Sequence, residues 1–392
     1  MSKLTVEPRL DGQRTELHFS DGTDPVWWEW RFPEDWTFMP PANANWAAID
    51  GLIAAQPRGG TLHVAGAVDK QLLQNLEQLS DIAAVWKPDR LHPVRITADK
   101  ETTSRGPRRN GHVFALSAGV DASFSLLRHS RGLAERQNRK PACAVTMVGL
   151  LFRPVEDPGL DDLMASAGAI AAAAGVPHLQ VRTNWLDICS ELVVQLPAGL
   201  AATLHQFNGS CRGAVIAADA NYTRECVLLP GWGSTQYTNP LLCSTDFEFQ
   251  TFGGAFSRPE RVADVISEAE IARHVRVCNT AFHKGHNCGR CEKCVRTMLL
   301  AMAAAGTSRP MFEADPSVRQ ILAINIRDVW ARGIWREVRN HLGANQWRER
   351  LAVQAILLRS YLQVPLKRLE LSVRPLVRRF RRGKGIRELR KQ

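Results

Sequence analysis

The stretch HVFALSAGVDASFSLLRH, residues 112–129, changes from strand to turn to helix and carries polar side chains where it changes. Residues 112–116 predict a short buried strand, residues 117–119 a tight turn and residues 120–129 a helix. The N–H groups of the first helical turn have no partner inside the helix, and the aligned peptide dipoles add positive partial charge there. This arrangement is typical of a site that binds phosphate or pyrophosphate.

The side chains of the turn favour the same ligand. Ser117 and Ser123 can add hydroxyl donors, and Asp121, which would repel a polyanion on its own, is expected to bind the Mg²⁺ that accompanies ATP. The expected phosphate-binding set is Ser117, Ala118, Gly119, Val120, Asp121 and Ser123. A serine-capped helix after a strand, with no ligand, is the alternative that explains the same residues.

Four cysteines form a second candidate site. They lie in VCNTAFHKGHNCGRCEKC as Cys278, Cys288, Cys291 and Cys294. Two successive Cys-x-x-Cys steps and one cysteine ten residues upstream can close a tetrahedron of thiolates around Zn²⁺. Such zinc is structural, because four thiolates leave no coordination position for water or substrate. The alternatives are His283 or His286 in place of Cys278, or an iron–sulfur cluster in place of zinc.

A disulfide interpretation of these cysteines is unfavourable. The chain has nine cysteines, an odd number, and three of the four candidate ligands lie within seven positions. The first residues do not have the pattern of a secretory signal. We therefore expect reduced cysteines and a cytoplasmic protein.

The first stretch resembles the pyrophosphate loop of the N-type ATP pyrophosphatases, Ser-Gly-Gly-x-Asp-Ser-Ser/Thr. Here it stands as Ser117-Ala118-Gly119-Val120-Asp121-Ala122-Ser123. Ala118 replaces a glycine and is expected to put a methyl group where the backbone approaches the phosphates, and Ala122 replaces a serine and removes a hydroxyl. With the cysteines downstream, the chain is similar to the 7-cyano-7-deazaguanine synthase family of queuosine biosynthesis over about residues 111–306.

A third match to that family lies between the two motifs. Ser257-Arg258-Pro259-Glu260 stands where the family has Thr-Lys-x-Glu, and Arg258 keeps the positive charge. The resemblance implies an enzyme that converts ATP to AMP and pyrophosphate, with Asp121 and Arg258 as catalytic residues. It would activate a carboxylate or carbonyl oxygen of a small-molecule substrate as an AMP ester, for attack by ammonia or another nucleophile. ATP and Mg²⁺ thus join Zn²⁺ as the expected cofactors.

Hydrophobic periodicity places the loop in a parallel sheet. Strands are expected at 142–152, 178–183 and 214–218, and helices at 161–174, 187–195 and 199–207. Alternating strands and helices predict a parallel sheet with helices on both faces and ligands at the carboxyl ends of the strands. Asn184 and Asp219 follow two of these strands, so we expect them to contact adenosine or substrate.

The residues before the loop predict a separate small α+β unit. Strands are expected at 17–19, 26–32, 61–64 and 94–98, and helices at 44–56 and 70–86. Within twenty residues of this part lie five of the eleven tryptophans, Trp27, Trp28, Trp30, Trp36 and Trp46. Their dense spacing favours a core and a partner interface, and a platform for stacking a base or sugar is the alternative. The polar residues 102–110 are expected to link this unit to the loop.

Two later stretches add to this picture. Residues 230–244 combine glycines, prolines, aromatics and hydroxyls, which suits either a loop that closes on substrate or an Ω-loop packed on its own tryptophan. From residue 309 the pattern becomes helical, with helices expected at 318–326, 328–342 and 346–362.

The positive charge is concentrated at the end of the chain. The formal net charge is +11, and residues 367–392 alone hold eleven Lys or Arg and two Glu. Such a tail binds an anionic membrane, an acidic partner or nucleic acid, or is only a solvated extension.

We therefore expect an α/β fold with a doubly wound parallel sheet of the pyrophosphate-loop (HUP) type. The expected divisions are a small α+β domain at 1–105, an ATP pyrophosphatase-like domain with a zinc knuckle at 106–306, a helical extension at 307–366 and a basic tail at 367–392. No stretch predicts a membrane span, and the oligomeric state is left open, a homo-oligomer included. Two rivals to the enzyme remain: a binding protein that holds a nucleotide without turnover, and a nucleic-acid-modifying enzyme docked by its tail.

Overall fold

The structure is a computed structural model of the whole chain. It describes residues 3–34, 36–37, 39–103, 110–151, 158–225, 231, 233–278, 286–326 and 328–361. These divide into two compact units. Unit 1 holds the described residues up to Arg276 and also His286, and unit 2 holds Val277, Cys278 and those from Asn287 onward. The predicted basic tail lies outside the described residues.

Unit 1 is organised around one sheet. Its strands are β1 (Lys3–Asp11), β2 (Arg14–Phe19), β3 (Val26–Arg31), β4 (Gly60–Asp69), β5 (Val94–Thr102), β6 (His112–Ala115), β7 (Pro141–Val148), β8 (His178–Thr183), β9 (Gly213–Ala217) and β10 (Glu248–Phe252). They form a ten-stranded sheet in the order β10-β9-β6-β7-β8-β3-β2-β1-β4-β5. The sheet therefore takes in both the residues before the loop and those after it.

The half of the sheet that carries the loop is parallel. Each neighbouring pair from β10 to β8 is parallel. The short strands β6 and β9 are buried at nearly every position, as expected of strands with helices over both faces. The prediction of an α/β fold with a parallel sheet is confirmed.

The prediction of a separate α+β unit at 1–105 is wrong. Strand β3 pairs antiparallel with β8, with Trp28 opposite Thr183 and Trp30 opposite Val181, so the first five strands extend the same sheet. Hydrophobic periodicity shows which residues form strands but not which free edge they join. It also missed β1 and β10 altogether.

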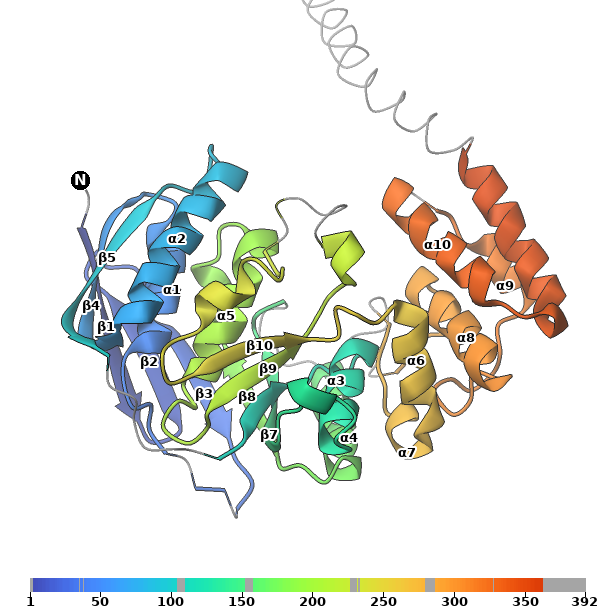
Figure 1. Cartoon of the computed structure of the whole chain (residues 1–392), viewed down its shortest axis with the longest axis horizontal. Helices are drawn as coiled ribbons and strands as arrows, with labels where there is room; N and C mark the ends of the chain where they lie inside the picture. Colours follow the sequence, from blue (N-terminus) through green and yellow to red (C-terminus); the bar gives the residue numbers. More distant parts are fainter. Residues whose placement is uncertain are drawn as a thin grey trace, which may run out of the picture. The chain divides into compact units, whose positions relative to one another are not determined.

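Helices cover both faces of this sheet. They are α1 (Asn45–Ala55), α2 (Lys70–Trp86), α3 (Val120–Ser130), α4 (Pro158–Ala173), α5 (Leu192–His205), α6 (Arg258–Ser267) and α7 (Ala269–Ala272). Figure 1 shows α1, α2 and α5 together on one face, and α3 and α4 on the other. Helix α6 packs on α3, and α7 packs on α4. Unit 1 thus has helix layers on both sides of its parallel strands, as in doubly wound folds.

Helix α5 differs from its prediction. The sequence predicted two helices, at 187–195 and 199–207, but a single helix runs from Leu192 to His205 with Pro197 inside it. Pro197 lies in the second turn, where the missing N–H removes at most one hydrogen bond. A side chain at Gly199 would collide with the Trp185 ring, so α5 can pack this closely only with glycine there.

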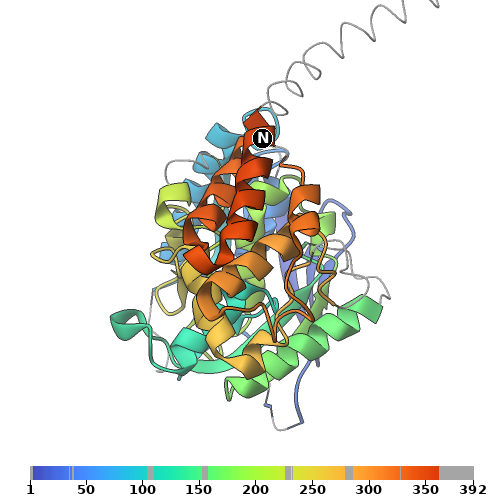
Figure 2. The same ribbon diagram turned by 90° about the vertical axis from the view of Figure 1, so that its right-hand side faces the viewer.

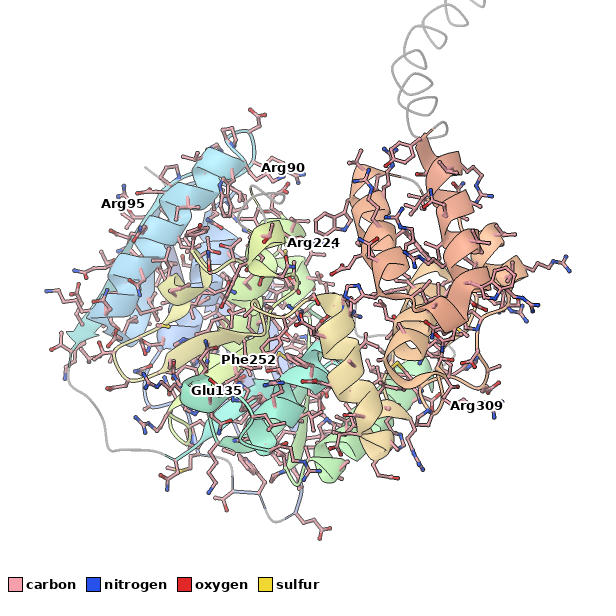
Figure 3. All side chains as sticks on the ribbon, turned by 45° about the vertical axis from the view of Figure 1, so that its right-hand side comes forward. Arg90, Arg95, Glu135, Arg224, Phe252 and Arg309 are labelled. Carbon is pink, nitrogen blue, oxygen red and sulfur yellow. The ribbon has the colours of Figure 1, made fainter. Side chains whose placement is uncertain are left out.

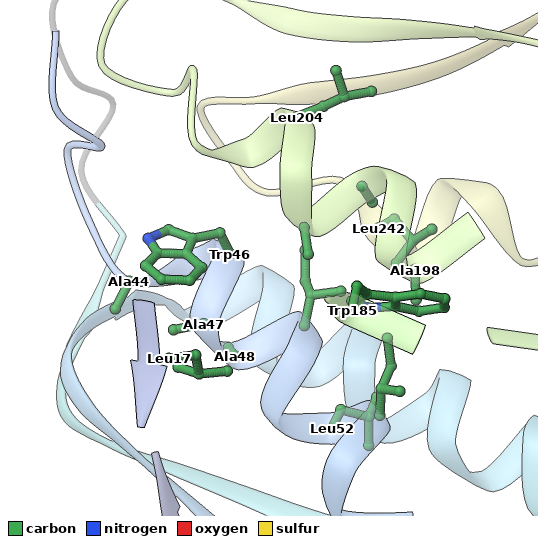
Figure 4. Packing of buried hydrophobic residues seen from close by; sticks show 14 of the residues in the cluster. Leu17, Ala44, Trp46, Ala47, Ala48, Leu52, Trp185, Ala198, Leu204 and Leu242 are labelled. Atoms are coloured by element: carbon green, nitrogen blue, oxygen red, sulfur yellow. The ribbon is translucent and has the colours of Figure 1, made fainter. Parts of the chain in front are cut away.

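The tryptophans of the first strands belong to the core. Trp28, Trp30 and Trp46 are buried, and Trp28 meets Trp46 edge to face with ring centroids 5.3 Å apart. Figure 4 shows this core continuing from Trp46 on α1 to Trp185 and to α5. The core interpretation of Trp28, Trp30 and Trp46 is therefore confirmed, and a stacking platform on these three rings is excluded.

Unit 2 is helical, as predicted. It contains α8 (Glu292–Ala305), α9 (Val318–Ala323), α10 (Val329–His341) and a helix over residues 347–361. The last two run side by side in Figures 1 and 2. Arg339 donates to Gln354 at 2.7 Å and Arg332 to the Ser360 carbonyl at 3.1 Å, which ties the two helices together. No helix in the described part of the chain is both long and apolar enough to cross a membrane.

Candidate functional site

The loop lies at the point where the strand order of unit 1 reverses. The chain runs from β6 outward through β7 to β8, and then returns to β9 on the other side of β6. In open α/β sheets the crevice outside the carboxyl ends of two such strands is where ligands bind. Three segments leave the sheet at this end: 116–119 after β6, 218–225 after β9 and 253–257 after β10. Figure 3 labels Arg224 and Phe252, which belong to the second segment and to the end of β10.

Backbone contacts hold the loop after β6. The Leu116 N–H donates to the Val145 carbonyl at 2.8 Å, and the Thr146 hydroxyl donates to the Leu116 carbonyl at 2.7 Å. The Arg276 N–H donates to the Ala118 carbonyl at 2.7 Å. The loop is therefore fixed by β7 on one side and by the end of unit 1 on the other.

Helix α3 begins without a side-chain cap. Its N-cap is Gly119, and no side chain accepts from the first-turn N–H groups. The first intrahelical bond here runs from the Ser123 N–H to the Gly119 carbonyl, so the amides of residues 120–122 have no partner in the helix. The alternative of a serine-capped helix is excluded, and these amides remain suited to an anion.

Ala118 adopts the left-handed conformation, with φ +53°. It is fully buried, so its methyl group points into the protein. This burial does not support the expectation that the methyl group would obstruct the approach of phosphates. At residue 118 the backbone adopts the left-handed conformation that a glycine would favour, which is less stable for alanine than for glycine.

The two serines differ in position. Ser117 is exposed beside the loop and can reach a ligand in solvent. Ser123 is fully buried, and its hydroxyl has no hydrogen-bond partner among the described residues. Ala122 is also buried. Of the two expected hydroxyl donors, only Ser117 is therefore at the surface, and Ser123 is buried in the first turn of α3.

Asp121 is held by two arginines of α6. Arg258 donates to one carboxylate oxygen, and Arg261 donates to the other at 2.9 Å. Arg261 is buried and also donates to the carbonyls of Ala218, Ala220 and Gly253, at 2.6, 3.1 and 2.8 Å. This one guanidinium therefore ties the segments after β6, β9 and β10 together.

Charge at this point favours an anion over a cation. Burial works to raise the pKa of Asp121, but the guanidiniums of Arg258 and Arg261 outweigh it, so the pKa is lowered and the carboxylate is ionised. Both oxygens are already occupied by cations, and a divalent ion placed there would face two positive charges at short range. Mg²⁺ bound by Asp121, as expected from the sequence, does not fit this arrangement.

The match at residues 257–260 has a structural explanation. The Ser257 hydroxyl caps α6 by accepting from the Glu260 N–H, and the Glu260 carboxylate accepts from the Ser257 N–H at 2.7 Å. This is a capping box, which the pattern Ser-x-x-Glu forms in many unrelated helices. Of the four residues in the match, only Arg258 faces the loop through its ion pair with Asp121.

Two acidic residues in the segment after β9, Asp219 and Glu225, also belong to this end of the sheet. Asp219, one of the predicted contacts, is exposed. Glu225 was not predicted; it is buried, and burial raises its pKa to about 7, with Asp219 adding to the rise and the Ala220 N–H and Arg261 opposing it. One oxygen of Glu225 has no hydrogen-bond partner among the described residues. The sequence gives no sign of this role, because the burial that makes Glu225 unusual depends on the fold.

Asn184 has a different role from the predicted one. Its side-chain oxygen accepts from the Trp27 N–H at 2.8 Å and its amide donates to the Pro25 carbonyl at 3.2 Å. These bonds fasten β3 to the end of β8, two strands away from β6. Asn184 is thus part of the junction between the halves of the sheet, and the prediction of a ligand contact is not supported.

The loop at 230–244 is packed in its described part. Gly233 donates to the Val193 carbonyl at 3.0 Å, and Thr235 and Thr238 are buried and bonded to each other at 2.9 Å. Tyr237 is exposed. Pro230 and Trp232 lie outside the described residues. Hydrogen bonds within the loop, such as the one between these threonines, are typical of an Ω-loop. Closure of the loop on a substrate stays a prediction.

The second site is the cysteine cluster of unit 2. The sulfur atoms of Cys278, Cys288, Cys291 and Cys294 all lie within 4.8 Å of one another. The Sγ atoms of Cys278 and Cys291 are 3.7 Å apart, and those of Cys288 and Cys294 are 3.9 Å apart. A tetrahedron with Zn–S bonds of about 2.3 Å has edges of roughly 3.8 Å. The four cysteines could therefore hold a single metal ion such as zinc.

Backbone N–H groups surround this cluster. Cys288 Sγ accepts from the Cys291 N–H at 3.3 Å, and Cys291 Sγ accepts from the Cys294 N–H at 3.4 Å at the start of α8. A side-chain hydrogen bond with the Cys294 thiol is the largest cause that lowers the pKa of Cys291 to about 4, and the Cys294 N–H adds to it. His286 is not part of the cluster, and His283 lies outside the described residues. The sequence had placed this knuckle with the loop domain, but it belongs to unit 2.

Comparisons with protein-family models, with curated proteins and with solved structures found no match to this chain.

Proposed function

We propose that unit 1 is an adenylating enzyme of the N-type ATP pyrophosphatase kind, similar to the 7-cyano-7-deazaguanine synthases. One observation carries the proposal: an uncapped helix start follows β6 at the switch point of the sheet, with Arg258 beside it. That combination of free amides, a positive helix end and an adjacent guanidinium suits the phosphates of ATP.

In this proposal an oxygen of the substrate attacks the α-phosphorus of ATP, and the bond to the β-phosphate breaks. Pyrophosphate leaves while the amides of residues 120–122 and Arg258 stabilise its developing charge. A nucleophile such as ammonia then displaces AMP from the ester. Asp121 positions Arg258 and Arg261, and no step assigned here to the chain's residues uses Mg²⁺.

Glu225 and Asp219 are the proposed contacts for the substrate. Glu225 can donate from its protonated form or accept from its ionised form near neutral pH, since its pKa is raised to about 7. A group that can do both suits a polar acceptor substrate better than a polyanion. The zinc proposed for the cysteine cluster is structural, because it would have no open position.

The test is ATP binding and pyrophosphate release, measured with labelled ATP and a panel of carboxylates and purine precursors. Arg258→Ala should weaken ATP binding by about tenfold to a hundredfold, because one charge-assisted contact is lost. Arg273→Ala is the matched control, because Arg273 is an exposed arginine whose guanidinium pairs with Glu270 of α7. Failure of the intact chain to bind ATP would exclude the proposal.

A second candidate is a protein that binds the nucleotide without turnover. The two ion pairs of Asp121 favour it, since a carboxylate held by two guanidiniums is a poor ligand for the metal that usually accompanies ATP. ATP binding that depends on Arg258, without pyrophosphate release from any substrate of the panel, would decide for this candidate.

A further inference from the structure

The helix at residues 347–361 in unit 2 is apolar on two opposite sides. Its buried side carries Ala352, Val353, Ile356, Leu357 and Ser360, which pack inside the unit. Trp347, Leu351 and Leu358 lie on the opposite side, at helical spacing i, i+4 and i+11, and they are 56%, 60% and 58% exposed. A helix of a soluble protein normally has polar residues there. We call Trp347, Leu351 and Leu358 the apolar ridge.

Arginines flank the apolar ridge on both sides. Arg348 lies on one flank and Arg350 on the other, while the only acidic residue of this helix, Glu349, lies toward the buried side. Arg359 is on the same flank as Arg348, but its guanidinium donates to the carbonyls of Leu322 and Ile324, so Arg348 and Arg350 are the flanking arginines. The Arg348 guanidinium lies 5.3 Å from the centre of the Trp347 ring. No residue on the outward half of the helix is negatively charged.

The neighbouring helix α10 adds to this charge. Arg332 and Arg336 lie over the Tyr361 ring, 4.3 and 5.6 Å from its centre. Arg336 also donates to the Tyr361 hydroxyl, which is the main cause of a lowered pKa for Tyr361. From Asp328 to Tyr361 the chain has six Arg and three acidic residues.

We propose that this face of unit 2 binds the surface of an anionic lipid membrane, with the apolar ridge in the headgroup boundary and the flanking arginines on lipid phosphates. An apolar strip bordered by cations is the pattern of helices that lie in such an interface. Arginine side chains can bend toward the phosphates while their stems cover the apolar strip. The sequence continues in the same way after Tyr361, with eleven Lys or Arg and interleaved apolar residues at 367–392.

Two other occupants fit less well. A second copy of the chain would bring arginine flanks against arginine flanks, because neither flank carries an acidic residue. A nucleic acid would put three apolar side chains against its phosphate backbone, at the position where a contact should be most polar.

The test is flotation of the full chain with vesicles of phosphatidylcholine alone or mixed with phosphatidylglycerol. The intact protein should float with the anionic vesicles only. The combined variant Trp347→Ser, Leu351→Ser and Leu358→Ser should lose at least about tenfold in partitioning, since each side chain loses apolar burial. A matched control replaces two exposed apolar residues of unit 1, Val85→Ser and Leu133→Ser, and should float like the wild type.

Two more measurements separate the ridge from the tail and from misfolding. The ridge variant should keep the circular dichroism and metal content of the wild type, because the three side chains are exposed. A chain ending at Pro365 should retain part of the binding, and that part should disappear in the ridge variant. Brominated lipids should quench fluorescence less in Trp347→Phe than in the wild type.

The proposal is overturned if the intact chain does not float with anionic vesicles, or if the ridge variant floats as well as the wild type. It is also overturned if the ridge variant loses RNA binding and vesicle binding is absent throughout. None of these outcomes depends on ATP binding in unit 1.

Discussion

Ala118 is the most strained residue of the loop. It holds φ +53° without a glycine's freedom, and its carbonyl accepts the Arg276 N–H. An L-residue in this conformation costs about 1–2 kcal/mol, which the surrounding contacts must supply. Strain of this kind at a loop end is common where a backbone is shaped for a ligand.

We expect Ala118→Gly to change the free energy of unfolding by less than about 1 kcal/mol, because strain relief is opposed by greater freedom of the unfolded chain and by the lost methyl. Ala118→Val should lose about 3 kcal/mol or more, since a β-branched residue tolerates this conformation poorly. Denaturant unfolding measures both. Equal effects of the two substitutions would contradict the assignment of φ at this position.

Asp50 is a second residue in an unfavourable environment, because its carboxyl group is buried in the core. It is fully buried, and burial raises its pKa well above the usual value, with only the Trp185 indole N–H donating to it at 2.8 Å. Its other oxygen has no partner among the described residues. The folded state therefore favours the protonated acid.

Asp50→Asn should stabilise the protein at neutral pH by about 1–3 kcal/mol, because the amide cannot ionise. The raised pKa means that stability is present below the unfolded pKa and is lost as pH rises toward the folded pKa. The gain should therefore shrink as the pH is lowered toward 4. Thermal unfolding of both proteins across this range is the measurement, and a gain that grows at low pH would contradict it.

The sequence was sufficient to name candidate residues but not to predict their partners or their burial. The loop and the four cysteines were predicted from residue types and spacing, and Arg258 from the resemblance to the synthase family. The partners of Asp121 were not, because Arg261 looks like any arginine of an amphipathic helix until α6 is placed against α3. Burial, which makes Glu225 and Asp50 unusual, is a property of the fold and not of the local sequence.

Among the elements, the knuckle formed by the cysteine cluster and the start of α8 carries the clearest prediction. Asn287 supports it by accepting from the Val277 N–H at 2.9 Å and donating to the Met311 carbonyl at 3.3 Å. Purified protein should contain about one zinc per chain, since four thiolates form a closed tetrahedral site.

Cys291→Ser should lose the metal and reduce the folded yield, because structural zinc supplies roughly 10–16 kcal/mol of apparent binding free energy in small domains. Cys189→Ser is the control, since Cys189 is a half-buried cysteine of unit 1 outside the cluster. Metal analysis of both variants is the measurement. A Cys291→Ser protein that keeps its zinc would contradict the assignment.

Element positions were predicted well where periodicity is strong. Helix α2 and strand β8 have the predicted bounds. Helix α5 was predicted as two pieces, but it is continuous, because Pro197 lies in its second turn, where at most one hydrogen bond is lost. The pairing of β3 with β8 could not be predicted, since it joins residues more than a hundred positions apart.

On the scale of the whole molecule, three histidines of unit 1, two buried and one half-buried, set the response to acid. Burial lowers the pKa of His129, His178 and His205 to about 4 each. Their contribution to stability is therefore present above the unfolded pKa of about 6.5 and is lost as pH falls toward 4. Each histidine can account for up to roughly 3 kcal/mol over this range.

We expect the melting temperature of unit 1 to fall steeply between pH 6.5 and 4, against the smaller opposite effects of Asp50 and Glu225. His178→Gln should make the fall shallower, because glutamine cannot gain a charge and can still bond to the Thr146 hydroxyl, which lies 2.8 Å from His178. Calorimetry of both proteins over this range tests this. Parallel pH profiles would show that His178 is not responsible.

The pairing of β3 with β8 also determines which truncations of the chain would expose a sheet edge. Without residues 3–31, β8 would become an open edge, and its row of unpaired N–H and C=O groups would be free to recruit strands from other molecules. The present outer edges are less hazardous: β10 has five residues, and β5 carries Arg95, Asp99, Lys100 and Glu101. The first strands therefore protect the sheet against aggregation, and a fragment that starts at the loop would lose solubility even where the proposed ligand site stayed intact.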